Sequence, residues 1–404
     1  MAKQKTGIWI IGGFGGVAAT SAVGLANLQA GRLSSTGLVS CLPQFSDLPF
    51  VNWEDFIVGG HEIRKSSLME AAQQLVSESR AFDASLMSGV ETTLAKWGAN
   101  FRPGIVRGAG KTIELLADRE FCNVAKTVSD AIQSVKVDLA EFRDQNELEQ
   151  VIVVNLASTE PPSDFTEIAD DWSSLEKQLA NAESQLPPSS VYAIAAIESE
   201  MPFVNFTPSV GSNLNAIRQL AEQKRVCHVG RDGKTGETFL KSVLAPAFGA
   251  RNLEVMSWVG HNIFGNRDGI VLNDPQNKAT KVKSKDSLLG QVLGYQPQTH
   301  TSIEYIQSLG DWKTACDHIH FRGFMGTPMV LQLTWQGCDS ILAAPLVLDL
   351  VRFTELAQRN GEFGELGFLS SFFKSPQGTA EQSFANQFEM LVDWTSKQRS
   401  ISNS

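Results

Sequence analysis

Residues 7–18 read GIWIIGGFGGVA, and this stretch decides the fold class of the chain. Its first five residues are a short apolar run of the kind that a buried parallel strand shows. Gly13, Gly15 and Ala18 then fit the pattern Gly-x-Gly-x-x-Ala, and residues 17–29 continue as a helix of small side chains. This order predicts a Rossmann-type dinucleotide site with a pyrophosphate at the helix N-terminus, although a tight turn without a ligand has the same pattern.

The same segment superficially resembles a secretory signal, because Lys3 and Lys5 precede the apolar residues 8–26. Four glycines within residues 12–16 oppose the uninterrupted helix that such a signal needs, at roughly 1 kcal/mol each. No later segment reaches the roughly 20 apolar residues of a membrane span. We therefore expect no membrane partner.

The composition narrows the class of protein further. A chain of 404 residues predicts two domains, or one domain with a large insertion. Hydrophobic residues make up 42% and charged residues 19%, which is typical of a globular protein. A net charge of −10 without a basic run argues against a nucleic-acid partner. Five cysteines without a Cys-x-x-Cys pair favour the reducing cytoplasm over a disulfide scaffold or a structural zinc site.

The choice of dinucleotide depends on the residues after the glycine turn. No Lys or Arg stands between Arg32 and Arg64, so nothing local would neutralise a 2′-phosphate, which favours NAD over NADP. The acidic residue expected about 20 positions after the turn is absent, because Ser34, Ser35 and Thr36 stand there. The contact to the NAD ribose must therefore come from elsewhere.

The rest of the chain predicts two kinds of architecture. Residues 66–148 look helical, and the buried strand expected at 150–156 ends in the polar turn 157–162, where open α/β sheets bind ligands. Beyond about residue 226, period-two alternation predicts a mixed or antiparallel sheet. Its strands are expected near 252–258, 301–307, 314–321 and 328–335. Helices return at 342–357 and within the last 25 residues.

Polar residues gather at the turns of this second half. Residues 230–238 open a helix whose N-terminal amides could bind an anion, although an ordinary capped helix looks the same. Residues 257–269 read as a glycine-rich loop after a strand, with amides and a carboxylate suited to hydroxyl groups. Lys281 and Lys285 would share one helix face, and they repel unless an anion lies between them. A solvated lysine face is the alternative.

Taken in order, these motifs resemble the myo-inositol-1-phosphate synthase family, most of all its shorter, prokaryotic-type members. The matching motifs are the glycine turn, Ala-Ser-Thr-Glu-Pro at 157–161, the helix start at 232–236, Gly-Asn-Arg-Asp-Gly at 265–269, the lysine pair, Gly-Asp-Trp-Lys at 310–313 and Asp339-Ser340. The resemblance spans roughly residues 7–395 and is weakest across 60–145.

The resemblance implies an α/β fold in which a mixed α+β catalytic and oligomerisation domain is inserted into a Rossmann-type NAD-binding domain. Residues 1–228 would form the NAD-binding domain, with a helical insert at about 60–148. Residues 229–335 would form the catalytic and oligomerisation domain, and residues 336–404 would return to the NAD-binding domain. It also implies a homotetramer.

The activity that the resemblance implies is the NAD-dependent conversion of D-glucose 6-phosphate to 1D-myo-inositol 3-phosphate. The enzyme would oxidise C5, enolise the ketone, close the ring by an intramolecular aldol step and reduce the ring ketone with the same NADH. Prokaryotic members often depend on a cation, and we assign no residues to it.

The family's functional residues carry over position by position. The expected catalytic residues are Lys281, Lys313, Lys374, Asp268 and Asp311. The expected substrate-binding residues are Asp232, Thr235, Gly236, Asn262, Asn266 and Lys285. The expected NAD-binding residues are Gly13, Phe14, Gly15, Gly16, Val17, Ser158, Thr159 and Asp339. Fixed ammonium groups suit this chemistry because they stabilise oxyanions, and a lysine with a lowered pKa can act as a base.

Two departures from the family pattern leave alternatives open. Arg267 and Trp312 stand where neutral or small residues are commoner, so the pocket could accept another sugar phosphate, such as fructose 6-phosphate. A non-catalytic NAD-binding homologue is the third reading. His318 and His320 would share one face of a strand, and we expect a packed histidine pair there rather than a metal site.

Overall fold

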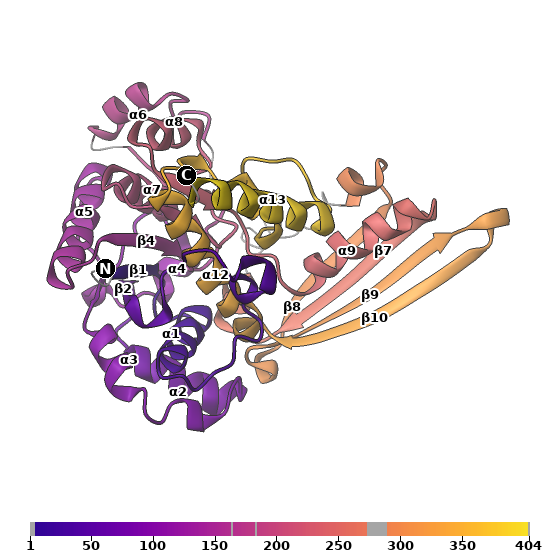
Figure 1. Ribbon diagram of the computed structural model, residues 1–404, viewed down its shortest axis with the longest axis horizontal. Helices are drawn as coiled ribbons and strands as arrows, with labels where there is room; N and C mark the ends of the chain where they lie inside the picture. The colour runs from indigo at the N-terminus through magenta and orange to yellow at the C-terminus, as the bar shows by residue number, and fades with distance from the viewer. Residues whose placement is uncertain (1–4, 163–164, 182–183, 273–288, 403–404) are drawn as a thin grey trace.

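The computed structural model describes residues 5–162, 165–181, 184–272 and 289–402, and two separate sheets organise them (Figure 1). The first has seven strands, and every neighbouring pair is parallel. Their order is β11 (Gly364–Glu365), β6 (Cys227–Gly230), β5 (Phe203–Asn205), β4 (Gln150–Asn155), β1 (Thr6–Ile11), β2 (Phe56–Glu62) and β3 (Phe101–Pro103). The order reverses between β1 and β4, which is where Rossmann-type sheets bind dinucleotides.

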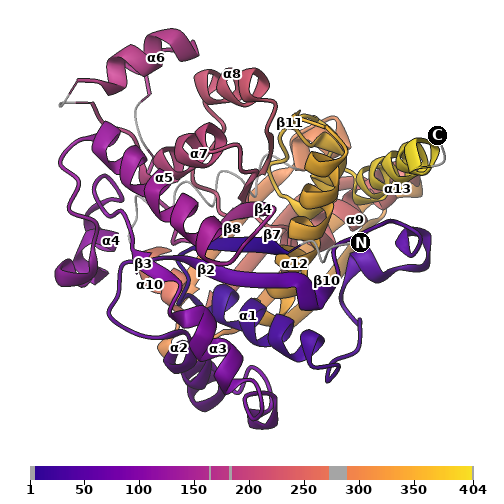
Figure 2. The same ribbon diagram turned by 60° about the vertical axis from the view of Figure 1, so that its left-hand side comes forward.

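Helices cover both faces of this sheet, because β1 is apolar on both sides. Ile8 and Ile10 pack into one core, while Trp9 and Ile11 pack into the other. The first core is covered by α1 (Gly16–Gln29), α2 (Leu68–Gln74), α3 (Glu91–Gly98), α12 (Asp339–Arg359) and α13 (Phe384–Ser402). The second is covered by α5 (Val128–Gln145), α6 (Trp172–Leu179), α7 (Pro188–Glu198) and α8 (Asn215–Lys224) (Figure 2).

The second sheet is mixed, which is one of the two alternatives that the sequence left open. Its order is β10 (Pro328–Cys338), β9 (Trp312–Arg322), β7 (Glu254–Phe264) and β8 (Gln298–Tyr305). β7 pairs with β8 in parallel and with β9 antiparallel. Helix α9 (Gly236–Ala250) packs Phe248 on this sheet beside Trp258. The hairpin of β9 and β10 extends away from the parallel sheet as an arm (Figure 1).

The chain returns to the first sheet after β10. Helix α12 packs along α1, and β11 adds the last parallel strand beside β6. The buried carboxylate of Asp349 on α12 accepts the backbone amides of Val39 (2.6 Å) and Ser40 (2.9 Å). The helices that follow β10 therefore pack on the same parallel sheet as α1, the helix after the glycine turn.

The prediction of a helical stretch at 66–148 is wrong in part, and β2 was not predicted. β3 and short helices interrupt the stretch, including α4 (Lys111–Leu116). β2 was missed because Gly59 and Gly60 break its apolar run. Packing requires both glycines: a β-carbon at Gly60 would overlap the carbonyl oxygen of Ile10, and one at Gly59 would lie 2.7 Å from the ring of Phe142.

Two further features concern membrane contact and the cysteines. Among the described residues, none of the helices combines the length and the apolar character that crossing a membrane requires. All five cysteines are described, and each is a free thiol.

Candidate active site

The glycine turn lies between β1 and α1, at the carboxyl edge of the parallel sheet. Gly12 has a φ of +80°, and the amides of Gly12 and Gly13 donate to the carbonyl of His61 on β2 (2.9 and 3.1 Å). Gly15 precedes α1 without a side-chain cap, and the first turn of α1 carries no acidic residue. The amides at the start of α1 cannot bond within the helix, so they suit a pyrophosphate.

Sequence reasoning missed Glu62, the last residue of β2. Its buried carboxylate accepts the backbone amide of Phe14 in the glycine turn at 2.7 Å. The side chain of Arg64 donates to the same carboxylate through two nitrogens, at 3.1 and 3.0 Å. An acid at the end of the second strand is the usual ligand of the NAD ribose. Glu62 lies far more than 20 positions after the glycine turn, because the connection between α1 and β2 is long.

Asp311 lies at the centre of a second cluster, at the start of β9. Its side chain is buried and accepts hydrogen bonds from the Asn266 amide group (3.0 Å), the Ser340 backbone amide (2.8 Å) and the Cys338 thiol (3.0 Å). Burial, with the negative charge of Asp339, raises the pKa of Asp311 above its ordinary value. A carboxyl held this way can keep a proton at a higher pH than an exposed one.

The two clusters meet at Gly16. A β-carbon on Gly16 would lie 2.5 Å from the hydroxyl oxygen of Ser340 and 3.7 Å from a carboxylate oxygen of Asp311. The first helical residue of the glycine turn therefore touches the cluster around Asp311. Parts of the chain about 300 residues apart in sequence form one site here.

Lys313 and Asp339 lie beside Asp311, and both are largely buried. The Lys313 ammonium is 3.7 Å from the Asp339 carboxylate and 5.0 Å from the centre of the Phe264 ring. Asp339 begins α12 directly after β10. Asp268 is half-buried in α10 (Arg267–Leu272), a short helix that follows Asn266.

A third group, the ion pair of Lys374 and Asp232, lies on the loops around β6. The Lys374 ammonium is 2.7 Å from the Asp232 carboxylate, and both side chains are more than nine-tenths buried. The backbone amide of Lys374 also donates to the Asp232 carbonyl (2.7 Å). The neighbouring Lys234 was not predicted as a site residue: its ammonium is buried and donates to Gln387, and burial lowers its pKa to about 7.

The predicted phosphate residues start α9. Thr235 precedes the helix, and Gly236, its first residue, has a φ of +55°. The buried side chain of Glu237 follows, 2.6 Å from the ammonium of the equally buried Lys241. Asn262 donates to Glu237 at 2.5 Å. The prediction that Asn262 lies on a loop is wrong, because β7 continues to Phe264 and Asn262 is fully buried within it.

The turn after β4 also reaches this edge. Ser158 is half-buried and Thr159 is buried. Glu160 fixes the turn: its carboxylate accepts the amide of Ser189 at the start of α7 (2.7 Å) and the Ser189 hydroxyl (2.5 Å). Burial raises the pKa of Glu160 to about 7.

Some predicted residues lie outside the described part of the chain. Lys281 and Lys285 fall within 273–288, so the structure places neither of them. For Arg267 only the backbone is described. Trp312 is described: its indole donates to the carbonyl of Ser79 at 2.7 Å, and 38% of the residue is exposed. His318 and His320 lie half-buried on β9, and no metal-binding group of three His, Cys, Asp or Glu residues occurs in the described ranges.

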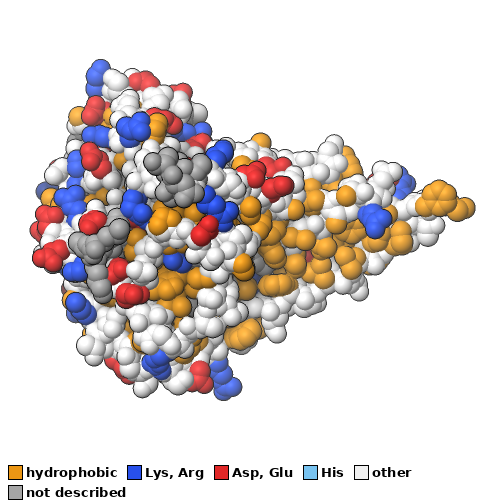
Figure 3. Space-filling view, viewed as in Figure 1, with side chains coloured by type: hydrophobic (Ala, Val, Ile, Leu, Met, Phe, Trp, Pro, Cys, Tyr) orange, Lys and Arg blue, Asp and Glu red, His pale blue; other side chains and the backbone are white. Residues whose placement is uncertain are grey.

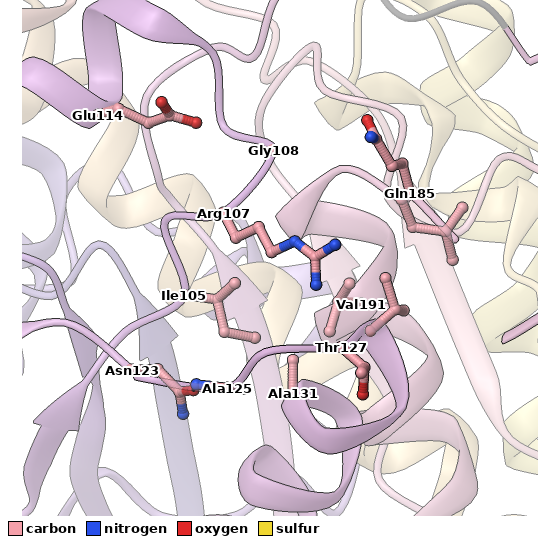
Figure 4. A pocket seen from close by; sticks show the side chains of 12 residues that line it. Ile105, Arg107, Gly108, Glu114, Asn123, Ala125, Thr127, Ala131, Gln185 and Val191 are labelled. Carbon is pink, nitrogen blue, oxygen red and sulfur yellow. The ribbon is translucent and has the colours of Figure 1, made fainter. Parts of the chain in front are cut away.

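A separate cavity of about 280 Å³ lies on the α5 and α7 side of the parallel sheet (Figure 4). Ile105, Val128 and Val191 supply apolar lining, while Arg107 and Gln185 supply polar groups. None of the predicted site residues lines it. It therefore stands apart from the meeting point at Gly16.

Comparison with known proteins finds one family along nearly the whole chain. A family model described as myo-inositol-1-phosphate synthase, and named for NAD binding, matches residues 6–395. The inositol-3-phosphate synthase 1 of Bacteroides thetaiotaomicron is 30% identical, over 100% of this chain and 96% of the relative. The inositol-3-phosphate synthase 1 of Populus euphratica is also 30% identical, but the match spans 78% of this chain and only 62% of the plant protein.

Two solved structures share the fold. The inositol-3-phosphate synthase of Caenorhabditis elegans has a TM-score of 0.87 at 24% identity, over 96% of this chain and 85% of that protein. A myo-inositol-1-phosphate synthase-related protein of Thermotoga maritima has a TM-score of 0.81 at 23% identity, over 97% of this chain and 99% of that protein. The predicted α/β class, with a Rossmann-type parallel sheet and a separate mixed sheet, is confirmed.

Proposed function

Because this chain belongs to the myo-inositol-1-phosphate synthase family, a family of enzymes, we propose that it converts D-glucose 6-phosphate to 1D-myo-inositol 3-phosphate with NAD. One observation carries the proposal. The start of α1 touches the cluster of Asp311 and Ser340 at Gly16, so a cofactor on the glycine turn would lie beside the acidic and basic residues of the second sheet. Cyclisation with internal oxidation and reduction needs this proximity.

The residues present fit NAD. The uncapped start of α1 suits the pyrophosphate, and the Glu62 carboxylate suits the ribose. Gly13, Phe14, Gly15, Gly16, Val17, Ser158, Thr159 and Asp339 would complete the site. NAD, when bound, supplies the hydride exchange that oxidises C5 and later reduces the ring ketone.

The start of α9 would hold the sugar phosphate. Backbone amides at Thr235 and Gly236 are at a helix N-terminus, which favours a phosphate, and Lys285 would add a charge. Asp232, Asn262 and Asn266 would bind hydroxyl groups or hold the lysines in place. Of these, Asp232 already orients Lys374 at 2.7 Å.

Ammonium groups would stabilise the oxygens that become negative during enolisation and ring closure. Lys313 is held by Asp339 and the Phe264 ring, largely out of water, where a fixed charge acts more strongly. Lys281 would exchange the proton beside the ketone, and Lys374 would stabilise a second oxygen. Asp311 and Asp268 would orient these groups, and the raised pKa of Asp311 suits a shared proton.

Arg267 and Trp312 keep another sugar phosphate as the alternative substrate. The indole of Trp312 donates to the carbonyl of Ser79, on the segment that follows α2. We propose glucose 6-phosphate because the family resemblance implies it, and we treat fructose 6-phosphate as the alternative to be tested alongside it.

The test is to incubate the purified protein with NAD and glucose 6-phosphate and to follow products by phosphorus NMR. We expect inositol phosphate without net NADH, and less turnover with fructose 6-phosphate. Lys313→Met and Lys281→Ala should lose most turnover, and Lys224→Met, an exposed lysine on α8, should keep it. Full turnover by Lys281→Ala with an intact fold would contradict the mechanism, and no product from either sugar would contradict the function.

We further propose that residues 1–228 and 336–404 form the NAD-binding domain and residues 229–335 the catalytic and oligomerisation domain of a cytoplasmic homotetramer. The arm supports self-association, because apolar side chains gather along it (Figure 3). Dependence on a cation is a further proposal without assigned residues, and activity after chelation and metal addition would test for it.

A further inference from the structure

A single π-helical turn (Leu75–Ser79) follows α2 directly and ends at Arg80, whose φ is +48°. Such turns insert an extra residue into a helix and often occur at functional sites. This one lies between the two halves of the candidate active site. Its first residue, Leu75, is buried with a methyl carbon 3.6 Å from the position of a β-carbon on Gly16.

The last residue of the turn, Ser79, holds the segment 310–313. The Ser79 hydroxyl accepts the backbone amide of Asp311 at 3.0 Å, and its carbonyl accepts the indole of Trp312 at 2.7 Å. A β-carbon at Gly310 would lie 2.7 Å from the Ser79 hydroxyl, so this approach requires a glycine there. Three consecutive residues that lead into β9 thus contact one serine of the Rossmann-type part.

These contacts complete a set that fixes Asp311 on every side. Its carbonyl accepts the amide of Asp339 (2.9 Å), and its carboxylate is held by Asn266 and Ser340. Ser79 supplies the partner of its remaining backbone group. Because Lys313 is two residues further along the chain, at the start of β9, the position of Asp311 also sets where the Lys313 ammonium lies.

We propose that Ser79 is a positioning residue: it sets the register of residues 310–313 against the glycine turn, and so places Asp311 and Lys313 relative to the cofactor. Trp312 contributes to the same positioning, because its indole donates a second hydrogen bond to Ser79. The inference rests on the proposed function for its catalytic consequence, while the attachment itself is a property of the fold.

The kinetic test compares Ser79→Ala with Ser79→Thr and Ser77→Ala. Ser77 is exposed in the same π-helical turn, so its variant is the matched control. We expect Ser79→Ala to lower kcat about tenfold to a hundredfold, because small misplacements of catalytic groups have effects of this size. The KM for glucose 6-phosphate and the Kd for NAD should change little. Ser79→Thr, which keeps the hydroxyl, should have a kcat close to that of the wild type.

Hydrogen exchange tests the attachment without reference to activity. The amide of Asp311 is protected by the Ser79 hydroxyl, so peptides covering 307–313 should exchange faster in Ser79→Ala and at the wild-type rate in Ser77→Ala. Trp312→Phe should accelerate exchange in the same peptides.

Three outcomes would overturn the inference. The first is an unchanged rate of hydrogen exchange in peptides 307–313 of Ser79→Ala, and the second is an unchanged kcat in that variant. The third is that Ser79→Ala impairs kcat, KM and NAD affinity together and that Ser79→Thr is impaired in the same way. An inactive wild-type protein would contradict the proposed function instead, and the exchange measurement would still decide whether Ser79 holds the turn.

Discussion

At the scale of single residues, we expect Glu62 and Arg64 to decide which dinucleotide binds. The preference for NAD rested on the absence of cations between residues 32 and 64, but the position that matters is the end of β2. There, the side chain of Arg64 donates two hydrogen bonds to the Glu62 carboxylate. The carboxylate both offers a ribose acceptor and neutralises the cation that could bind a 2′-phosphate.

Replacing Glu62 with Gln should therefore weaken NAD and favour NADP. We expect the Kd for NAD to rise about tenfold or more, since a hydrogen bond to a charged group contributes about 1.5–3 kcal/mol. The Kd for NADP should change less or fall, because Arg64 is released. Titration calorimetry measures both constants, with the exposed Glu54→Gln as control. An unchanged ratio of the two constants would refute this role of Glu62.

The ion pair of Lys374 and Asp232 should contribute strongly to the free energy of unfolding. Lys374→Met removes the ammonium that pairs with the buried Asp232 carboxylate, which costs about 3–5 kcal/mol. The double variant Asp232→Asn/Lys374→Met should recover part of this loss. Urea denaturation measures the free energy of unfolding, and Lys224→Met is the exposed control. A loss below about 1 kcal/mol in the single variant would show that Asp232 finds another partner or becomes protonated.

At the scale of elements, the carboxylate of Glu160 joins the turn after β4 to the start of α7. Both of its oxygens accept hydrogen bonds from Ser189, and its own amide donates to the Ser209 hydroxyl at 3.1 Å. The turn that carries Ser158 and Thr159 is thereby fixed by its neighbour rather than by its own sequence. This arrangement places a titratable group next to the two residues of the turn that are expected to bind the cofactor.

The buried carboxyl group of Glu160 should make the free energy of unfolding depend on pH. Burial raises its pKa from 4.5 to about 7, so the folded state favours the protonated form. Its contribution to the free energy of unfolding is then fully present below pH 4.5 and is lost as the pH rises through 7. Between pH 4.5 and 8, wild type should lose up to about 3 kcal/mol relative to Glu160→Gln, whose amide stays neutral. Urea denaturation at both pH values measures this difference, and parallel pH profiles would contradict it.

At the scale of the whole molecule, the β9–β10 arm leaves apolar side chains in water. Phe324 and Met325 at its tip are 92% and 87% exposed, and Val330 on the edge strand β10 is 52% exposed. An edge strand with apolar side chains on its surface is a surface for association. This supports the proposed homotetramer, in which copies of the chain would cover the arm.

Sedimentation should therefore give a mass four times the 44.0 kDa of the chain. Val330→Lys places a charge on the edge strand and should shift the protein to smaller species. Leu115→Lys, at a 73% exposed position in the Rossmann-type part, should leave the mass unchanged. A monomeric wild type, or an unchanged mass for Val330→Lys, would contradict association through the arm.

The elements that the sequence predicted well are those whose periodicity matches their burial. β1 and β4 are apolar on both faces, and the strands of the second sheet alternate along their length. β2 was missed because Gly59 and Gly60 make room for neighbouring parts of the sheet. Asn262 was placed on a loop because a buried asparagine looks like a turn residue until its partner, Glu237, is known.

The sequence by itself determined the Rossmann-type opening, the presence of a second sheet and the family, because these depend on local patterns and on the order of motifs. Only the tertiary structure decided that Glu62 ends β2 beside Phe14, that Ser79 holds Asp311, and that Gly16 touches Ser340. The reason is physical: each of these contacts joins residues far apart in the chain. A hydrogen bond or close approach between them leaves no periodic signal at either position, so it exists only once the chain has folded.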